Sequence, residues 1–213
     1  MKAESRRDPR ALGLAAGWLV VLVLSAVAVH PDRVSGAEEA VFRALNAIPD
    51  LAYWPVWVVM QLGNLLAIPA AALVVLISRR WRLAGALLLA GGAKTFLSRA
   101  VKDVVTRHRP ASVIDDVVRR GDASATGEAF VSGHAVIAFS IAVLVHPYLP
   151  PGKRWIPWAL ATTVCVGRVY VGAHLPLDVV GGAALGTAVG LILRFLCGTA
   201  SGHADERRVR KDQ

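Results

Sequence analysis

The segment GRVYVGAHLPLD, residues 167–178, joins two runs of apolar residues that are typical of membrane-spanning helices. It places Arg168, His174 and Asp178 close together in the sequence. Charged groups between two membrane-spanning helices are energetically costly unless they face a polar cavity. Pro176 suits the first turn of a helix, where its missing N–H is no loss. Asp178 should therefore stand in that turn and reach back to the ring of His174. The alternative is that all three are interface charges at a helix start.

Composition supports a membrane protein. The chain has 213 residues, 55% of them hydrophobic, and its apolar residues come in blocks that are too long for a soluble core. We expect a retained helix at residues 11–29, because the sequence from Val27 to Pro31 is a poor signal-peptide cleavage site. Cys165 and Cys197 both lie inside apolar runs, so neither a disulfide framework nor a zinc site is expected.

The apolar runs predict an all-α, polytopic membrane protein in which six transmembrane helices form a bundle. The expected spans are residues 11–29, about 53–78 (interrupted by Gln61, Asn64 and Pro69), 83–101, 130–149, 155–171 and 176–197. Along the sixth span, Gly182, Gly186 and Gly190 recur every four residues, a pattern that lets helix backbones approach closely.

A short amphipathic helix is expected between the first two spans. It runs from about Glu38 to Ile48, with Ala40, Val41 and Leu45 on its apolar side. Such a helix is typical of one that lies on the outer surface of the membrane.

Basic residues predict the topology. They gather in an N-terminal arm (residues 1–10), in two short loops and in a C-terminal tail (residues 198–213), so both termini should be cytoplasmic, on either side of a membrane domain at 11–197. The tail is short and lacks interleaved aromatic residues, which argues against nucleic-acid binding. The net charge of +9 fits a basic inner face and does not choose a ligand.

One outer loop, from about residue 102 to 128, is also basic, against the positive-inside rule. Anion binding would explain this exception. In this loop we expect Lys102 and Arg109, seven residues apart, to share a helix face if the helix continues. Arg107 and His108 lie off these positions and are expected to be solvated.

A further polar cluster, Ser132-Gly133-His134, opens the fourth span. Ser132 is a good N-cap residue. It would leave the N–H groups of Gly133 and His134 pointing outward at the positive end of the helix dipole, which is a ready site for an anion.

These residues are suited to phosphoryl transfer. Lys102, Arg109 and Arg168 would neutralise the phosphate oxygens, the two arginines by bidentate geometry and the lysine as a point charge. We expect no metal or other cofactor, because the three cations would do the charge work that Mg²⁺ does elsewhere.

The histidines would carry the chemistry. His174 would attack phosphorus in line and form a phosphohistidine, and Asp178 would stabilise the developing imidazolium. His134 would protonate the leaving oxygen and then activate the water that releases phosphate.

The sequence resembles the type 2 phosphatidic acid phosphatase superfamily of membrane lipid phosphatases over about residues 52–197. The likeness rests on three motifs that occur in the family's order. In the first, six residues separate Lys102 from Arg109-Pro110, and the second is Ser132-Gly133-His134. In the third, five residues separate Arg168 from His174, and three separate His174 from Asp178. Two positions depart from the family pattern. Val131 stands where the family usually has proline, and Gly167 where it usually has serine, which puts one phosphate hydrogen bond in doubt.

The resemblance implies a six-helix fold, a metal-independent phosphohistidine mechanism and an active site on the extracytoplasmic face of the cell membrane. The expected substrate is a lipid phosphate or diphosphate whose tail stays among the membrane lipids. Polyprenyl diphosphate, phosphatidic acid, phosphatidylglycerol phosphate and a prenyl-linked sugar phosphate all fit, and the sequence does not choose among them or predict an oligomeric state. The alternatives are a lipid phosphotransferase that uses the same site and a non-catalytic lipid-phosphate transporter or binding protein. For Lys94, in the third span, pairing inside the bundle and a substrate role are both open.

Overall fold

The computed structural model describes residues 5–6, 8–121 and 123–200, and most of the predicted basic arm and tail lies outside these residues. The described chain is helical apart from one antiparallel pair of two-residue strands, β1 (Ser5–Arg6) and β2 (Thr199–Ala200). The helices are α1 (Arg10–Ala28), α2 (Gly36–Asn46), α3 (Tyr53–Met60), α4 (Ala67–Ile77), α5 (Trp81–Val104), α6 (Pro110–Val113), α7 (Gly133–Val145), α8 (Ile156–Tyr170) and α9 (Pro176–Cys197), with short 3₁₀ turns at Asp50–Ala52, Gln61–Gly63, His146–Tyr148 and Pro151–Lys153.

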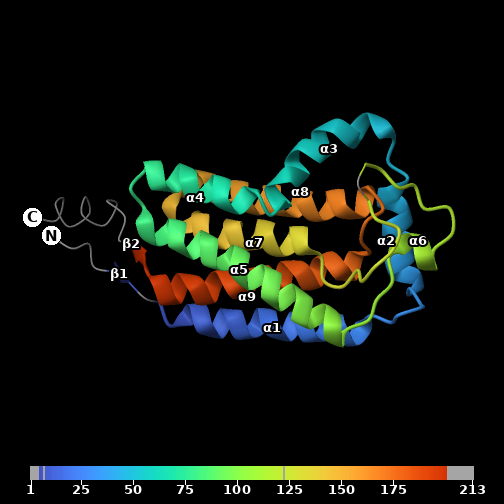
Figure 1. Cartoon of the computed structure of the whole chain (residues 1–213), viewed down its shortest axis with the longest axis horizontal. Coiled ribbons are helices and arrows are strands. Elements are labelled where there is room, and N and C mark those ends of the chain that lie inside the picture. The colour runs from blue at the N-terminus through green and yellow to red at the C-terminus, as the bar shows by residue number, and fades with distance from the viewer. Residues whose placement is uncertain (1–4, 7, 122, 201–213) are drawn as a thin grey trace, which may run out of the picture.

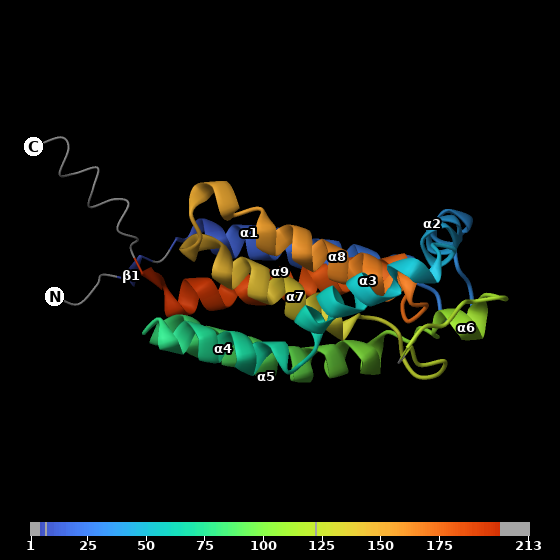
Figure 2. The same cartoon turned by 90° about the horizontal axis from the view of Figure 1, so that it is seen from above.

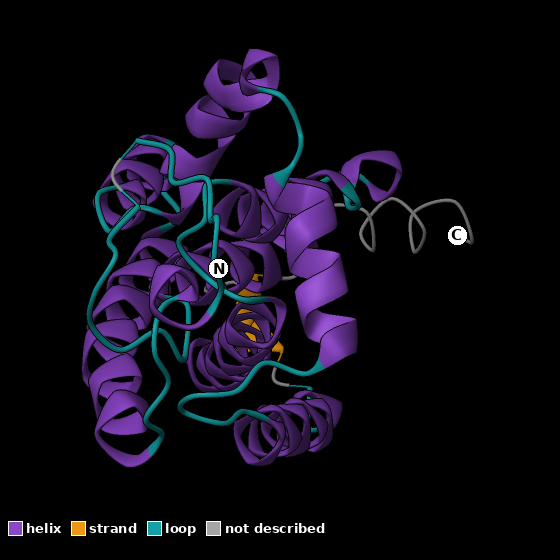
Figure 3. Ribbon diagram, turned by 90° about the vertical axis from the view of Figure 1, so that its right-hand side faces the viewer, coloured by secondary structure: helices purple, strands orange, loops and turns teal. Residues whose placement is uncertain are grey.

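The long helices run side by side as a bundle, and α2 lies across one end of it (Figures 1 and 3). Helix α9 packs along both α1 and α7, and α5 packs on α4 and α7 (Figure 2). The strand pair lies at the opposite end of the bundle from α2 (Figure 1). All long connections that carry the predicted polar clusters therefore meet at the α2 end.

Glycines set the close contact between α7 and α9. A Cβ atom on Gly182 would stand 2.6 Å from the carbonyl oxygen of Ser132, and one on Gly186 would stand 2.9 Å from the Cα of Val136. The predicted small-residue pattern is thus the surface on which α7 packs. Because this contact begins at Ser132, it fixes the start of α7 against the second turn of α9.

The predicted membrane spans are supported in part. A helix or a broken helix stands at each of the six predicted positions. Among the described residues, however, only α1 and α9 are long and apolar enough to cross a membrane by themselves. The pair made by residues 50–63 and α4 would add a third span, bent by 71° near the predicted interruption. The count of six spans stays a prediction.

The amphipathic helix is present as α2, and the face that it buries against the protein is more polar than its apolar spacing indicated. Ser35 caps its start by accepting a hydrogen bond from the N–H of Glu38. The buried residues are Glu38, Phe42 and Asn46, whereas Val41 is half exposed. The reason is that polar side chains on this face have partners within the protein: Asn46, for example, donates to the carbonyls of Val118 and Tyr170. Apolar periodicity cannot reveal such a face.

Candidate active site

The predicted polar clusters meet where the ends of α5, α7, α8 and α9 converge. Backbone hydrogen bonds join them: the N–H of Ala129 donates to the carbonyl of Arg107 over 2.8 Å, and that of Ser132 to the carbonyl of Asp178 over 3.0 Å. The side chain of Arg109 donates to the carbonyl of Ala173 over 2.7 Å. Segments that are distant in the sequence thus form one site.

His174 and Asp178 lie on the connection from α8 to α9. Pro176 is the first residue of α9, as predicted, and Asp178 in the first turn accepts the N–H of Leu175 over 2.8 Å. The same carboxylate oxygen, Oδ2, lies 3.5 Å from Nδ1 of His174. Both side chains are almost completely buried. The predicted proximity of this carboxylate and this imidazole is therefore present, but Nδ1 of His174 makes no hydrogen bond to a residue that the structure describes.

Three cations surround His174. Burial is the main reason that the pKa of His174 lies well below its ordinary value, and the positive charges of Arg109, Arg168 and Lys102 lower it further. A hydrogen bond to the backbone of Ala129 acts in the opposite direction and is the smallest of these effects. The ring is consequently neutral at neutral pH, which is the form that can act as a nucleophile.

Lys102 and Arg109 reach this site by a different route from the predicted one. Helix α5 ends at Val104, so the helix does not continue to Arg109 and the two residues do not share a helix face. The chain instead leaves the helix in an extended conformation at Val105. The ammonium of Lys102 donates to the carbonyl of Glu128, in the segment that leads to α7.

The start of α7 completes the site. Ser132 occupies the N-cap position, but its side chain makes no capping hydrogen bond, which corrects the predicted cap. Within the described residues, Ser132 Oγ and Arg109 Nε are buried without a hydrogen-bond partner. Leaving such groups unsatisfied costs about 1–3 kcal/mol each, so their presence favours a polar ligand between them. Gly133 and His134 follow in the first turn of α7, where backbone N–H groups are available to an anion.

Comparison with known proteins identifies the family. The model of the PAP2 superfamily matches residues 79–199, which is more than half of the chain. The chain belongs to the PAP2 superfamily.

Curated relatives and solved structures agree with this assignment. The chain is 25% identical over 186 residues to an undecaprenyl-diphosphatase of Sulfolobus acidocaldarius, covering 82% of this chain and 88% of that one. It is 24% identical over 179 residues to the putative undecaprenyl-diphosphatase YbjG of Escherichia coli, covering 80% and 87%. The structure is similar to LpxE of Aquifex aeolicus, with a TM-score of 0.70 and 25% identity over 77% of this chain and 98% of that one. It is also similar to a transmembrane PAP2 type phosphatidylglycerolphosphate phosphatase of Bacillus subtilis, with a TM-score of 0.69 and 24% identity over 85% and 94%.

Packing explains one of the two departures from the PAP2 pattern, Gly167, and shows the surroundings of the other, Val131. A Cβ atom on Gly167 would stand 2.7 Å from Cγ of Met60 and 2.9 Å from Cγ1 of Val56, so the position faces α3. The glycine lets α3 approach α8 closely. Val131 is fully buried in the apolar cluster that also contains Leu185 of α9.

Arg107 is a residue whose place in the PAP2 site the sequence did not indicate. It was expected to be solvated, but its side chain is 1% exposed, and it forms ion pairs with Glu38 at 2.7 Å and Asp178 at 3.3 Å. His108 is half exposed, as expected, and lies 3.4 Å from Asp32. Because Glu38 is far from Arg107 in the sequence and outside the three motifs, no sequence signal linked them.

Lys94 points toward the start of α7. Its Nζ lies 3.2 Å, and its Cε 2.9 Å, from the point where a Cβ of Gly133 would stand. Its side chain makes no salt bridge or hydrogen bond with any residue that the structure describes. Lys94 therefore brings an additional positive charge to the segment Ser132–His134.

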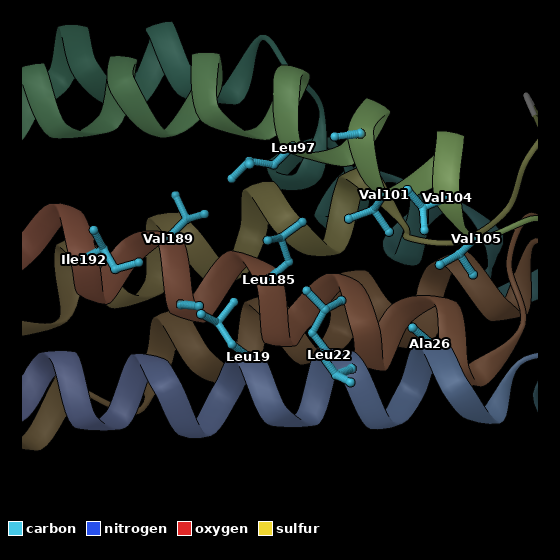
Figure 4. Close-up of a pocket in the computed structure, with 13 residues that line it drawn as sticks. Leu19, Leu22, Ala26, Leu97, Val101, Val104, Val105, Leu185, Val189 and Ile192 are labelled. Carbon is cyan, nitrogen blue, oxygen red and sulfur yellow. The ribbon is translucent and has the colours of Figure 1, made fainter.

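An apolar cavity lies beside the site in the wall of the bundle. It has a volume of about 420 Å³ and is lined by residues of α1, α5 and α9, including Leu22, Leu97, Val101 and Leu185 (Figure 4). Its lining extends along α5 to Val104, two residues beyond Lys102. The cavity therefore runs from the level of the site into the apolar part of the bundle.

Proposed function

We propose that this chain is a membrane phosphatase that removes the terminal phosphate of a polyprenyl diphosphate through a phosphohistidine on His174. The coarser part of this function follows from the family: the chain is a PAP2 enzyme that acts on lipid phosphates. The observation that carries the finer part is the buried, neutral His174, with Asp178 on one ring nitrogen and three cations around it.

In the first step, Nε2 of His174 attacks the terminal phosphorus, because Nδ1 lies 3.5 Å from the carboxylate of Asp178. Since Nδ1 makes no hydrogen bond within the described chain, the bond to the backbone of Ala129 is made by Nε2, and the substrate phosphate would take its place. An N–P bond forms as the P–O bond to the leaving group breaks, and His134 supplies a proton to the departing oxygen. Arg109, Arg168 and the unpartnered hydroxyl of Ser132 bind the phosphoryl oxygens, whose charge is greatest in this transition state.

In the second step, water attacks the phosphohistidine. His134, which has lost its proton, accepts one from the water, the N–P bond breaks, and inorganic phosphate leaves. Asp178 balances the positive charge that the imidazole carries while it is phosphorylated. The cations do the electrostatic work in both steps, so we propose that no metal is needed.

Three features favour a polyprenyl diphosphate. The two curated relatives are named as undecaprenyl-diphosphatases, one of them putatively. Lys94 brings a further cation beside Gly133, next in sequence to His134, and we propose that it binds the second phosphate of a diphosphate. The apolar cavity between α1, α5 and α9 provides a place for the first part of the prenyl tail.

The site is proposed to face the extracytoplasmic side, with both termini in the cytoplasm and six spans. Single cysteines near Ser124 and near Lys153 test this topology. A membrane-impermeant thiol reagent should label only the first in intact cells, and labelling of only the second would turn the site inward.

Phosphate release by the purified enzyme from matched lipids tests the substrate. Polyprenyl diphosphate should be hydrolysed with a higher kcat/KM than polyprenyl monophosphate or phosphatidic acid. Lys94→Met should reduce kcat/KM for the diphosphate more than for the monoesters. Equal losses on all lipids would remove Lys94 from substrate selection. A phosphotransferase would instead need an acceptor lipid before it removes phosphate from the substrate. A transporter would release no phosphate from any lipid.

A further inference from the structure

A chain of buried charges connects the surface helix α2 to the nucleophile. Oε2 of Glu38 lies 2.7 Å from Nη2 of Arg107, and Nε of Arg107 lies 3.3 Å from Oδ1 of Asp178. The second oxygen of Asp178 faces His174. All four side chains are less than 10% exposed. Ionised groups are seldom buried without partners, so these four form one electrostatic unit.

We propose that Glu38 and Arg107 are positioning residues for catalysis, which hold Asp178 in place and set the charge that it presents to His174. This proposal rests on the proposed role of His174 as nucleophile. Glu38 lies outside residues 79–199, the region that the family model matches, so it adds a contribution from α2 to the motifs.

Geometry supports the positioning role. Arg107 is held at both ends, because its guanidinium contacts two carboxylates and its backbone N–H donates to Oε2 of Glu128 over 2.7 Å. Glu38 is held as well, since its other oxygen accepts the N–H of Leu177 over 2.9 Å. Leu177 is in the first turn of α9, next to Asp178. Glu38 therefore contacts Arg107, which pairs with Asp178, and it also contacts the helix turn to which Asp178 belongs.

Charge balance gives Glu38 a second role. Arg107 alone would cancel the negative charge of Asp178, but Glu38 shares the guanidinium and leaves the three groups with a net charge of −1. An imidazole that becomes phosphorylated gains positive character, which a net negative neighbour stabilises. Among the residues that the structure describes, the other charged groups that act on His174 are Lys102, Arg109 and Arg168, and all of them oppose this positive character. The net charge of the unit consequently matters for the reaction.

Removing the charge of Glu38 and removing the charge of Arg107 should shift the pH profile in opposite directions. Glu38→Gln makes the unit neutral, so protonation of His174 becomes harder and the acid limb of kcat/KM moves to lower pH. Arg107→Gln gives the unit a charge of −2, and the limb moves to higher pH. Both variants should lower kcat by about ten- to hundredfold, the size expected when a catalytic group is slightly misplaced, with little change in KM.

A matched control stands next to Glu38 on the same helix. Glu39 forms an ion pair with Arg43 at 2.7 Å, and both side chains are substantially exposed. Glu39→Gln should leave kcat and the acid limb unchanged. Thermal unfolding in detergent, measured on every variant, identifies any loss of fold.

The decisive experiment compares the pH profiles of the wild type and the three glutamine variants on polyprenyl diphosphate, with His174→Ala alongside. Opposite shifts of the limb for Glu38→Gln and Arg107→Gln support the proposal, and either variant alone reports the sign if the other does not fold. The proposal is overturned if the acid limbs are unchanged, if they shift in the same direction, or if both variants fail to fold. Glu38 and Arg107 would then be purely structural residues. Full activity of His174→Ala would instead overturn the proposed function.

Discussion

The contact between α7 and α9 should control both stability and activity, and Gly186 tests it. Alanine at this position would place a Cβ 2.9 Å from the Cα and 3.0 Å from the carbonyl carbon of Val136, which are backbone atoms that cannot rotate away. Overpacking of this kind costs about 1–3 kcal/mol. The same substitution also gains about 1 kcal/mol of helix propensity, which partly hides the clash.

Gly92 in α5 supplies the matched control for this test. It is exposed, and a Cβ there would meet nothing within 4 Å, so Gly92→Ala has the propensity gain without the clash. The difference between the two variants isolates the packing cost. At about 2–4 °C per kcal/mol for a chain of this size, Gly186→Ala should unfold roughly 2–12 °C below Gly92→Ala in detergent.

The same displacement should reach the active site. Helix α7 carries His134 and α9 carries Asp178, so pushing the two helices apart should lower kcat in Gly186→Ala and leave it unchanged in Gly92→Ala. Equal melting temperatures and equal kcat for the two variants would refute the claim that this glycine contact positions the catalytic groups.

Three further predictions concern the chemistry. Because burial and neighbouring cations lower the pKa of His174, its nucleophilic neutral form persists into acid, and the acid limb of kcat/KM should lie below pH 6.5; a limb at or above 6.5 would contradict the electrostatic account. Arg168→Lys keeps the charge but loses the bidentate fork, so kcat/KM should fall by about tenfold or more, and a wild-type value would mean that this arginine does not bind the phosphoryl group. Excess EDTA should leave phosphate release unchanged, whereas inhibition that added Mg²⁺ reverses would show that the cations need a metal.

The sequence predicted those parts of the structure that depend on local pattern. Apolar runs located each long helix, and Pro176 located the start of α9 because proline is tolerated only in the first turn. Spacing also placed Asp178 against His174, since four residues bring two side chains together across a helix start. These features follow from interactions within a few residues.

Features that depend on tertiary contacts were missed. Apolar periodicity gave no sign that α2 buries Glu38 and Asn46, because their polar partners lie far away in the sequence. For the same reason Arg107 looked like a loop cation, although it is among the most buried side chains of the described chain. The sequence suggested that Gly167 costs one hydrogen bond to phosphate. Its contacts with α3 depend on how the helices pack, so the sequence could not predict them.

The central claim is that His174 becomes phosphorylated, and trapping the intermediate tests it most directly. In a His134→Ala variant the second step should slow more than the first, because a phosphate leaving group can depart without a proton whereas the water loses its base. Incubation with polyprenyl diphosphate labelled in its terminal phosphate should therefore leave label on the protein. After an alkaline quench, which preserves phosphohistidine, peptide mass spectrometry should find the phosphate on His174, and the additional His174→Ala substitution should abolish it. Label on another residue, or full phosphate release by His174→Ala alone, would contradict the account.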